Sequence, residues 1–414
     1  IEPFKNAKGL KSPYTKFIKD FNLSLLPSNI SVRGDLDRSF SKIIYRNDGF
    51  ESAPNYLKFF TFNRSYNVRW NLTKSLTLEY TARANAVIDE PDSDPEGGYS
   101  NVLGRTITAS EYRDSVNRNL RNFGRMKNYD QSVTVNYTLP FDKFPATNWV
   151  GADYRFTANY GWKAGPVNIP DSKVRPGQTD IADSLDFRNT IMNSRERSIT
   201  GKVDLVKLYN KVSFLKKINT PPPPKPKNAP KGKPDPADTL PKPPKLLVNL
   251  AKILMSVRSA NGTLTINDGT ILPGFTETPY LFGNSKRTAA PGWGFIFGDQ
   301  DANIRKRAAE NGWLTKSEYL TIPFSQTQTI SLTARANVEP NPDIKIQLDI
   351  RRESQASYEE IYRYDDALQG YQSLNPSRRG NYRISTVMIN TAFNGSNSSV
   401  RSEVFEEFER NLVV

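Results

Sequence analysis

Hydrophobic and polar residues alternate with a period of two along much of this chain, most clearly around two copies of the sequence TARAN. In residues 76–86 the even positions are Leu, Leu, Tyr and three Ala, and the odd positions between them are Thr, Glu, Arg and Asn. In residues 330–338 the even positions are Ile, Leu, Ala, Ala and Val, again separated by polar residues. Successive side chains of a strand point to opposite sides, so this alternation predicts β-strands with one apolar and one polar face.

The same pattern predicts further strands throughout the chain. Turn residues at 27–29, 73–75, 259–262 and 341–343 indicate hairpins, and therefore antiparallel neighbours. The pattern gives about twelve to fourteen strands, many of them longer than the five or six residues usual in soluble proteins. We predict an all-β, antiparallel fold with further strands at 21–25, 30–36, 60–72, 131–139, 150–162, 199–205, 247–257, 263–272, 344–350 and 382–393.

Strands with one apolar and one polar face occur in two kinds of fold. In a soluble β-sandwich the apolar face packs on a second sheet, whereas in a transmembrane β-barrel it meets lipid and the polar face lines a wet lumen. Long strands with aromatic residues near their ends favour the barrel, because a crossing strand needs about ten residues and interfacial belts are aromatic. We predict an antiparallel transmembrane β-barrel sector with long loops. Its lumen-facing residues include Arg69, Arg83, Asp153, Arg155 and Arg335, and its lipid-facing or interfacial aromatics are Phe60, Phe62, Tyr66, Trp70, Tyr154, Phe156, Tyr160 and Trp162.

Two short helices and one long loop interrupt the predicted strands. Thr108 and Glu111 have the spacing of a capping box, which predicts a helical insertion near 108–122. Residues 301–311 predict a second short helix, which ends at Asn311-Gly312. Eleven prolines in 220–244 exclude a helix or a sheet ladder there. The predicted organisation is a barrel segment 1–218, a Pro/Lys-rich disordered loop 219–245, and a barrel segment 246–414 with a Gly/aromatic loop and helix near 290–311.

The composition narrows the function classes. The chain of 414 residues contains no histidine and no cysteine, which removes the commonest general base, disulfides, thiolate metal sites and cysteine nucleophiles. Its formal charge of +14 is patchy, with eight lysines and two aspartates between Lys216 and Lys245 and a second basic cluster at 105–127. This distribution lacks the aromatic-plus-basic signature of nucleic-acid modules, so no nucleic-acid partner is expected. No apolar stretch has the roughly 20 residues of a membrane helix.

Three segments are candidates for chemistry. The acidic run 89–94 lacks the spacing of an EF-hand loop and fits a solvated hairpin tip better. The segment 292–300, GWGFIFGDQ, lacks the Lys-Ser/Thr of a phosphate loop, and its glycines fit close packing of aromatic rows better. The acidic residues Glu406, Glu407 and Glu409 lie in a charged C-terminal stretch. We predict no catalytic, cofactor-binding or metal-binding residues and no enzymatic activity.

Several phrases of the sequence are similar to one protein family. They are NLRNFGRMKNYDQ (119–131), LPFDKFPATNWVGADYRFTANYGWKAGP (139–166), LVKLYNKVSFLKKIN (205–219), TILPGF (270–275), APGWGFIFGDQ (290–300) and LTARANVEPNPD (332–343). Together they resemble the SprA/Sov family, the outer-membrane translocons of the type IX secretion system and gliding motility in Bacteroidetes. The resemblance spans most of 119–343, in matching order and spacing. Residues 1–40 and 351–414 resemble the family only in their general residue pattern, without a matching motif.

The resemblance implies a very large β-barrel in the bacterial outer membrane that exports folded cargo proteins. It also implies plug and shuttle proteins as partners, besides cargo and outer-membrane lipid. Family members are several times longer than this chain, so an internal segment of a longer protein is expected, in line with the missing initiator Met and signal peptide. Two other functions stay open: a surface-exposed β-sandwich adhesin or carbohydrate-binding protein, and a carboxylate-based glycosidase with paired acids in a cleft.

Overall fold

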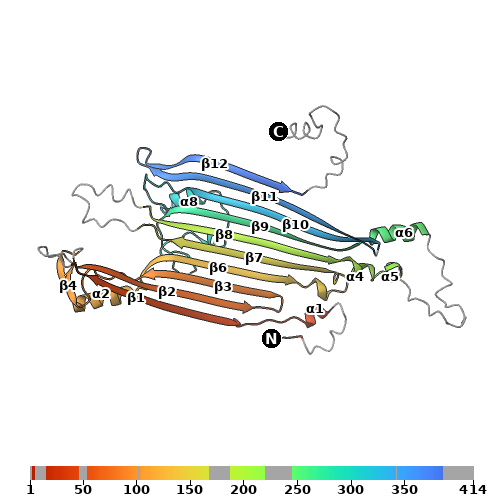
Figure 1. Cartoon of the computed structure of the whole chain (residues 1–414), viewed down its shortest axis with the longest axis horizontal. Coiled ribbons are helices and arrows are strands. Elements are labelled where there is room, and N and C mark those ends of the chain that lie inside the picture. The colour runs from red at the N-terminus through yellow and green to blue at the C-terminus, as the bar shows by residue number, and fades with distance from the viewer. Residues whose placement is uncertain are drawn as a thin grey trace.

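The computed structural model describes residues 2–4, 15–45, 54–100, 103–166, 187–219, 245–280, 282–341 and 343–385. Ten strands form one antiparallel sheet in the order β1-β2-β3-β6-β7-β8-β9-β10-β11-β12, each pairing with the next (Figure 1). The prediction of an all-β, antiparallel fold is confirmed. The sheet is open, with β1 and β12 at its edges. Its strands are β1 (Asn29–Ile43), β2 (Asn55–Asn71), β3 (Leu76–Val87), β6 (Arg125–Leu139), β7 (Val150–Lys163), β8 (Asn189–Asp204), β9 (Val257–Phe275), β10 (Phe324–Asn341), β11 (Ile344–Asp365) and β12 (Gly370–Ile384).

The described residues form twelve strands, and those of the large sheet are longer than the predicted segments, from 12 residues in β3 to 22 in β11. The turn predicted at 259–262 was wrong, because this segment lies inside β9. There Gly262 pairs with Gly201 of β8 on one side and Ala334 of β10 on the other, so two ladders keep the backbone extended. No strand forms at 21–25, residues 27–29 lead into β1, and the predicted strand 382–393 is described only to the end of β12.

The two predicted helices are present. α2 (Ala109–Arg121) begins with the capping box, in which Thr108 Oγ1 accepts from the Glu111 amide and the Glu111 carboxylate accepts from the Thr108 amide. α8 (Ile304–Glu310) lies within the second predicted helix. The count of two was too low, since the described residues also form α1 (Lys16–Lys19), η2 (Phe141–Lys143), α4 (Leu205–Tyr209), α5 (Ser213–Asn219), α6 (Lys245–Leu254) and α7 (Trp293–Ile296).

The predicted strand 247–257 is the clearest error of the secondary-structure prediction. Most of this segment belongs to α6, and β9 begins only at Val257. Its sequence KLLVNLAKIL repeats apolar residues at intervals of three and four, the helical spacing, which the short apolar run conceals. The Pro/Lys-rich segment 220–244 lies outside the described residues. β8 and β9, on either side of it, pair directly along Asn189–Asp204, so the sheet continues across this loop.

The strand register creates two continuous faces. Arg83, Asp130, Gly161 and Met192 follow one another across β3, β6, β7 and β8 on one face, and Ala84, Tyr129, Trp162 and Ile191 follow on the other. We call the face that carries Arg83 the polar face, and the face that carries Ala84 the apolar face. Period-two alternation is therefore matched from strand to strand here, and register shifts interrupt it in five of the strand pairs.

The connections differ between the two ends of the sheet. Residues 88–124 and 276–323 leave from the end at which β3 and β9 finish, which we call the insertion end, on the left in Figure 1. The first insertion holds α2 and a small sheet of β4 (Gly97–Ser100) and β5 (Arg105–Thr108), and the second holds α7 and α8. The opposite end has short connections at 72–75 and 342–343, and the long connection that contains α4, α5 and α6.

Both insertions fold back onto the apolar face. Side chains of 276–323 form one buried cluster with apolar-face residues of β3, β6, β7, β8 and β9. Residues 88–124 pack over β1 and β2, where the Tyr112 ring lies 4.7 Å from the Lys58 ammonium and Glu90 pairs with Arg38 at 2.7 Å. The hydrophobic core therefore lies at the insertion end, between the sheet and its own insertions.

Candidate functional site

The polar face carries all five side chains that the sequence predicts to face a lumen. Arg69, Arg83, Asp153, Arg155 and Arg335 are all exposed there. Three of the arginines pair with acids of adjacent strands on the same face: Arg69 with Glu79 at 3.3 Å, Arg155 with Glu196 at 4.0 Å and Arg335 with Asp349 at 2.6 Å. Exposed pairs of this kind contribute little stability.

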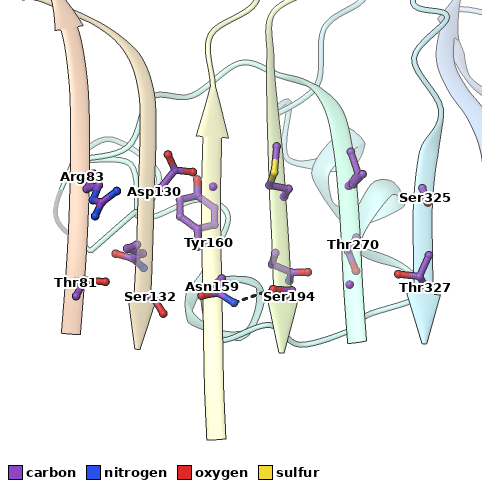
Figure 2. A pocket seen from close by; sticks show the side chains of 16 residues that line it. Thr81, Arg83, Asp130, Ser132, Asn159, Tyr160, Ser194, Thr270, Ser325 and Thr327 are labelled. Atoms are coloured by element: carbon purple, nitrogen blue, oxygen red, sulfur yellow. Dashed lines mark hydrogen bonds between the residues drawn. The ribbon is translucent and has the colours of Figure 1, made fainter. Parts of the chain in front are cut away.

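A hollow of about 620 Å³ lies on the polar face between β3 and β10. Figure 2 shows hydroxyl and amide side chains of neighbouring strands in one row across it, and the hydrogen bond from Asn159 to Ser194. The register places Thr81, Ser132, Asn159, Ser194 and Thr327 in this row. Apolar residues of this face lie toward the insertion end and include the exposed Leu57, Phe59, Met192 and Ile271. Small neutral side chains dominate this row, and Arg83, Asp130, Met192 and Ile271 also line the hollow.

The apolar face has a band that the insertions leave uncovered, toward the opposite end of the sheet. Ile199 is 44 % exposed and Ile350 is 53 % exposed there. On β10 the band covers residues 330–338, about 27 Å at the ordinary rise of a strand. We call this surface the apolar band. Its half-buried or exposed members include Ile30, Val32, Val68, Trp70, Leu78, Val133, Val135, Tyr154, Phe156, Ile199, Leu264, Ile266, Ile330, Leu332, Leu348 and Ile350.

Two of the eight aromatic residues predicted to face lipid do not do so. Tyr160 is 1 % exposed and Trp162 is 2 % exposed, because both lie beneath the 276–323 insertion. Trp162 Nε1 donates to the Glu277 carbonyl at 2.9 Å, so the insertion also satisfies the indole polar atom. Ala82 and Ala84 are buried in the same cluster, and Ala86 is also buried. The other six aromatics, Phe60, Phe62, Tyr66, Trp70, Tyr154 and Phe156, lie on the apolar face and stay half-exposed.

One cross-strand row of the apolar face is polar, and it holds the second insertion in place. Gln131 Nε2 donates to the Phe282 carbonyl at 3.0 Å, and Gln326 Nε2 donates to the Asp301 carbonyl at 2.9 Å. Between them, Asn193 Nδ2 donates to the carbonyls of Phe295 and Asp299, at 2.7 and 3.2 Å. Gln131, Tyr160, Asn193, Thr270 and Gln326 are register partners from β6 to β10. We call these five residues the polar row. The sequence prediction did not include it, although Gln and Asn at positions that the alternation assigns to the apolar face indicate such a row.

A buried carboxylate lies one row from the polar row, on the side of the apolar band. Asp268 is 3 % exposed, and its oxygens accept from Arg195 at 3.1 Å, Arg197 at 2.9 Å and Gln328 at 2.9 Å. A buried charge persists only with such partners, since its desolvation penalty is large. The cluster lies at the boundary between the covered and the uncovered part of the apolar face.

The candidates for chemistry are occupied by structural contacts. In the acidic run 89–94, Asp89 pairs with Arg125 at 2.8 Å and Asp94 pairs with Lys42 at 2.8 Å. The hydrogen bond from Lys42 is the main reason that the pKa of Asp94 lies below its usual value. Among the described residues, no group of three or more potential ligands could hold a metal ion. In 292–300 the Phe295 and Ile296 side chains are buried, and Glu406, Glu407 and Glu409 lie outside the described residues.

No protein-family model matches the chain, and no curated protein matches it. Within the described part of the chain, none of the helices has the length and hydrophobicity needed to cross a membrane.

Proposed function

We propose that this chain forms a sector of a β-barrel wall in the bacterial outer membrane, with the apolar band against lipid and the polar face toward a water-filled lumen. The observation that carries the proposal is the pair of unlike surfaces on the same part of one sheet. A soluble protein rarely leaves so wide an apolar surface open to water, whereas a membrane barrel requires it. Strands of 12 to 22 residues are long enough to cross at a tilt.

We further propose that the channel conducts folded proteins, as the resemblance to the SprA/Sov translocons implies. Ten strands form an open sheet here, whereas about eight strands already close a small barrel, so the parent barrel is wide. A wall of serine, threonine and asparagine with paired charges forms few strong contacts with a passing protein surface. Cargo, plug and shuttle proteins are the partners that this function requires, and it requires no chemical step from the wall.

Photo-crosslinking in secreting cells tests the protein-conducting role. A photoreactive amino acid replaces Thr157 on the polar face of the full-length protein, and the matched control replaces its neighbour Phe156 in the apolar band. We expect secreted proteins to crosslink at Thr157 and lipid alone at Phe156. Crosslinking of no cargo at Thr157 during active secretion would contradict the role.

The rival adhesin has a different experimental signature. A surface-attached β-sandwich buries its apolar face between two sheets and stays soluble and monomeric when it is released without detergent. A barrel wall fractionates with the outer membrane and aggregates without detergent. Detergent-free solubility of the chain would favour the adhesin.

A further inference from the structure

A row of aromatic side chains crosses the outer surface of the 276–323 insertion. The Phe282 ring lies 5.5 Å from Tyr80 of β3 and 6.3 Å from Trp293, and the Trp293 ring stacks on Phe297 at 5.9 Å. Phe282, Trp293 and Phe297 are half-exposed, whereas Phe295 and Ile296 on the other side of α7 are buried. We call Phe282, Trp293 and Phe297 the aromatic shelf.

The shelf lies at the level where the apolar band ends. The carbonyls of Phe282 and Phe295 accept from Gln131 and Asn193, both in the polar row. One row further toward the opposite end is the row of Tyr80 and Val133, where the apolar band begins. The aromatic shelf therefore lies next to the first row of the apolar band, where the insertion begins to cover the sheet.

The backbone is strained to present one of these rings. Phe282 has a φ of 51°, in the left-handed region that a bulky residue rarely adopts. The next residue, Gly283, fits only because it lacks a Cβ, which would lie 2.8 Å from the Tyr160 ring. The Phe282 ring is 51 % exposed and packs on Tyr80 at the margin of the core.

The first insertion repeats this arrangement. Phe123 follows α2 with a φ of 62°, is exposed, and stacks on Phe62 of β2 at 6.2 Å. The Arg64 guanidinium lies 4.9 Å from the Phe123 ring. Two insertions from different parts of the chain thus each hold an exposed aromatic ring, in a left-handed conformation, beside the apolar face.

The second insertion, 276–323, also carries cationic side chains. The Lys286 ammonium lies 5.6 Å from the ring of the exposed Tyr280, and the side chain of Arg287 is mostly exposed beside its partner Glu277. Aromatic rings at the edge of an apolar surface, with cations beside them, match the headgroup region of a membrane, where rings lie among the headgroups and cations meet phosphates.

We infer that the aromatic shelf binds the headgroup layer of the membrane leaflet at the insertion end, and so fixes the depth at which the sheet sits in the membrane. This inference rests on the proposed function, because it needs the apolar band to be in lipid. Its occupant is a lipid surface with anionic phosphates. A protein partner at the same surface is an outcome that the test below separates from it.

Nitroxide labels at single cysteines measure this depth; the chain itself contains no cysteine, and any cysteine elsewhere in the full-length protein is first replaced by serine. The full-length protein is reconstituted in vesicles of phosphatidylethanolamine and phosphatidylglycerol, and collisions with oxygen and with a polar nickel complex are compared. Trp293→Cys and Phe297→Cys report the shelf, and Ile199→Cys and Ile330→Cys report the apolar band. The matched control is Tyr319→Cys, because Tyr319 is 54 % exposed in the same insertion and Trp293 is 55 % exposed. Tyr319 lies beside Leu320, which packs near Gly274 at the insertion end, away from the band.

We expect the oxygen-to-nickel collision ratio to rise several-fold from Tyr319 to Trp293 and Phe297, and to be highest at Ile199 and Ile330. A water-like ratio at Trp293 and Phe297, with high ratios at Ile199 and Ile330, overturns the shelf and leaves the barrel wall intact. Low collision with both reagents at the shelf shows that protein, either the rest of the chain or a copurified partner, covers the shelf, and also overturns the inference. Water-like ratios at Ile199 and Ile330 overturn the proposed function itself.

Discussion

The two halves of the apolar face use similar residues for different purposes. At the insertion end, Tyr160 and Trp162 are core residues beneath the chain's own insertion. A few residues earlier on the same strand, Tyr154 and Phe156 have the same parity and remain half-exposed in the apolar band. Alternation sets the direction in which a side chain points, but not what it meets there. That depends on the polar row, which is where the insertion attaches.

The largest effect is expected when a covered ring is removed. Trp162→Ala leaves a cavity under the insertion and costs about 3–5 kcal/mol of the free energy of unfolding. The matched control Phe156→Ala leaves no internal cavity and should cost clearly less. The two variants are compared by urea unfolding of the detergent-solubilised protein. Far-ultraviolet circular dichroism monitors the unfolding, because this signal reports the backbone and not the removed tryptophan. Equal losses would show that the band is as buried as the core.

A charge in the apolar band separates lipid from water as its surroundings. Ile330→Arg should cost about 2–4 kcal/mol if the residue lies near the middle of the bilayer. Its neighbour Thr329 lies on the polar face, so Thr329→Arg should be nearly neutral. The amount of each variant that assembles in the outer membrane is the measurement. Equal assembly of both variants would argue against lipid contact.

Loss of an anchor in the polar row should loosen the insertion without unfolding the sheet. Asn193→Ala leaves the buried carbonyl of Phe295 and the partly buried carbonyl of Asp299 without this donor, at a cost of about 1–3 kcal/mol. Hydrogen exchange of the 293–300 amides should then accelerate. Asn159→Ala on the polar face removes only an exposed hydrogen bond to Ser194 and serves as the control. Unchanged protection in Asn193→Ala would show that the row does not hold the insertion.

The smallest expected effect concerns the capping box of α2. Thr108→Ala should destabilise this helix by about 1 kcal/mol, with Thr106→Ala as the control. The hydrogen bond from the Thr108 amide, followed by that from Arg105, lowers the pKa of Glu111 below its ordinary 4.5. The stabilisation from Glu111 is therefore complete above that value and is lost as the pH falls through the lower folded-state pKa. Amide exchange in α2 from pH 6 downward should show this loss only in the acidic range.

The sequence was sufficient for local and periodic features. The parity of Arg69, Arg155 and Arg335 placed them on one face correctly, because strand alternation is a property of each strand alone. The capping box at Thr108 and Glu111 is equally local. The run that became α6 was misread, since a short apolar run fits both a strand and a helix.

The covering of Tyr160 and Trp162 could not be predicted in the same way. It depends on Gln131, Asn193 and Gln326, which belong to three strands and form a row only through the register of the intervening pairs. Each of them, taken alone, is one polar residue at an apolar position. Their common function, holding the backbone of the insertion, is a long-range property of the fold.

Cysteine labelling of β7 tests the central claim most directly, because adjacent residues on this strand point to opposite faces. Single cysteines at Arg155 and Thr157, and at Tyr154 and Phe156, are exposed to a membrane-impermeant maleimide in intact outer membranes. The barrel wall predicts rapid labelling at Arg155 and Thr157, and little at Tyr154 and Phe156. Rapid labelling at Tyr154 and Phe156 with inert Arg155 and Thr157 would invert the two faces and contradict the account.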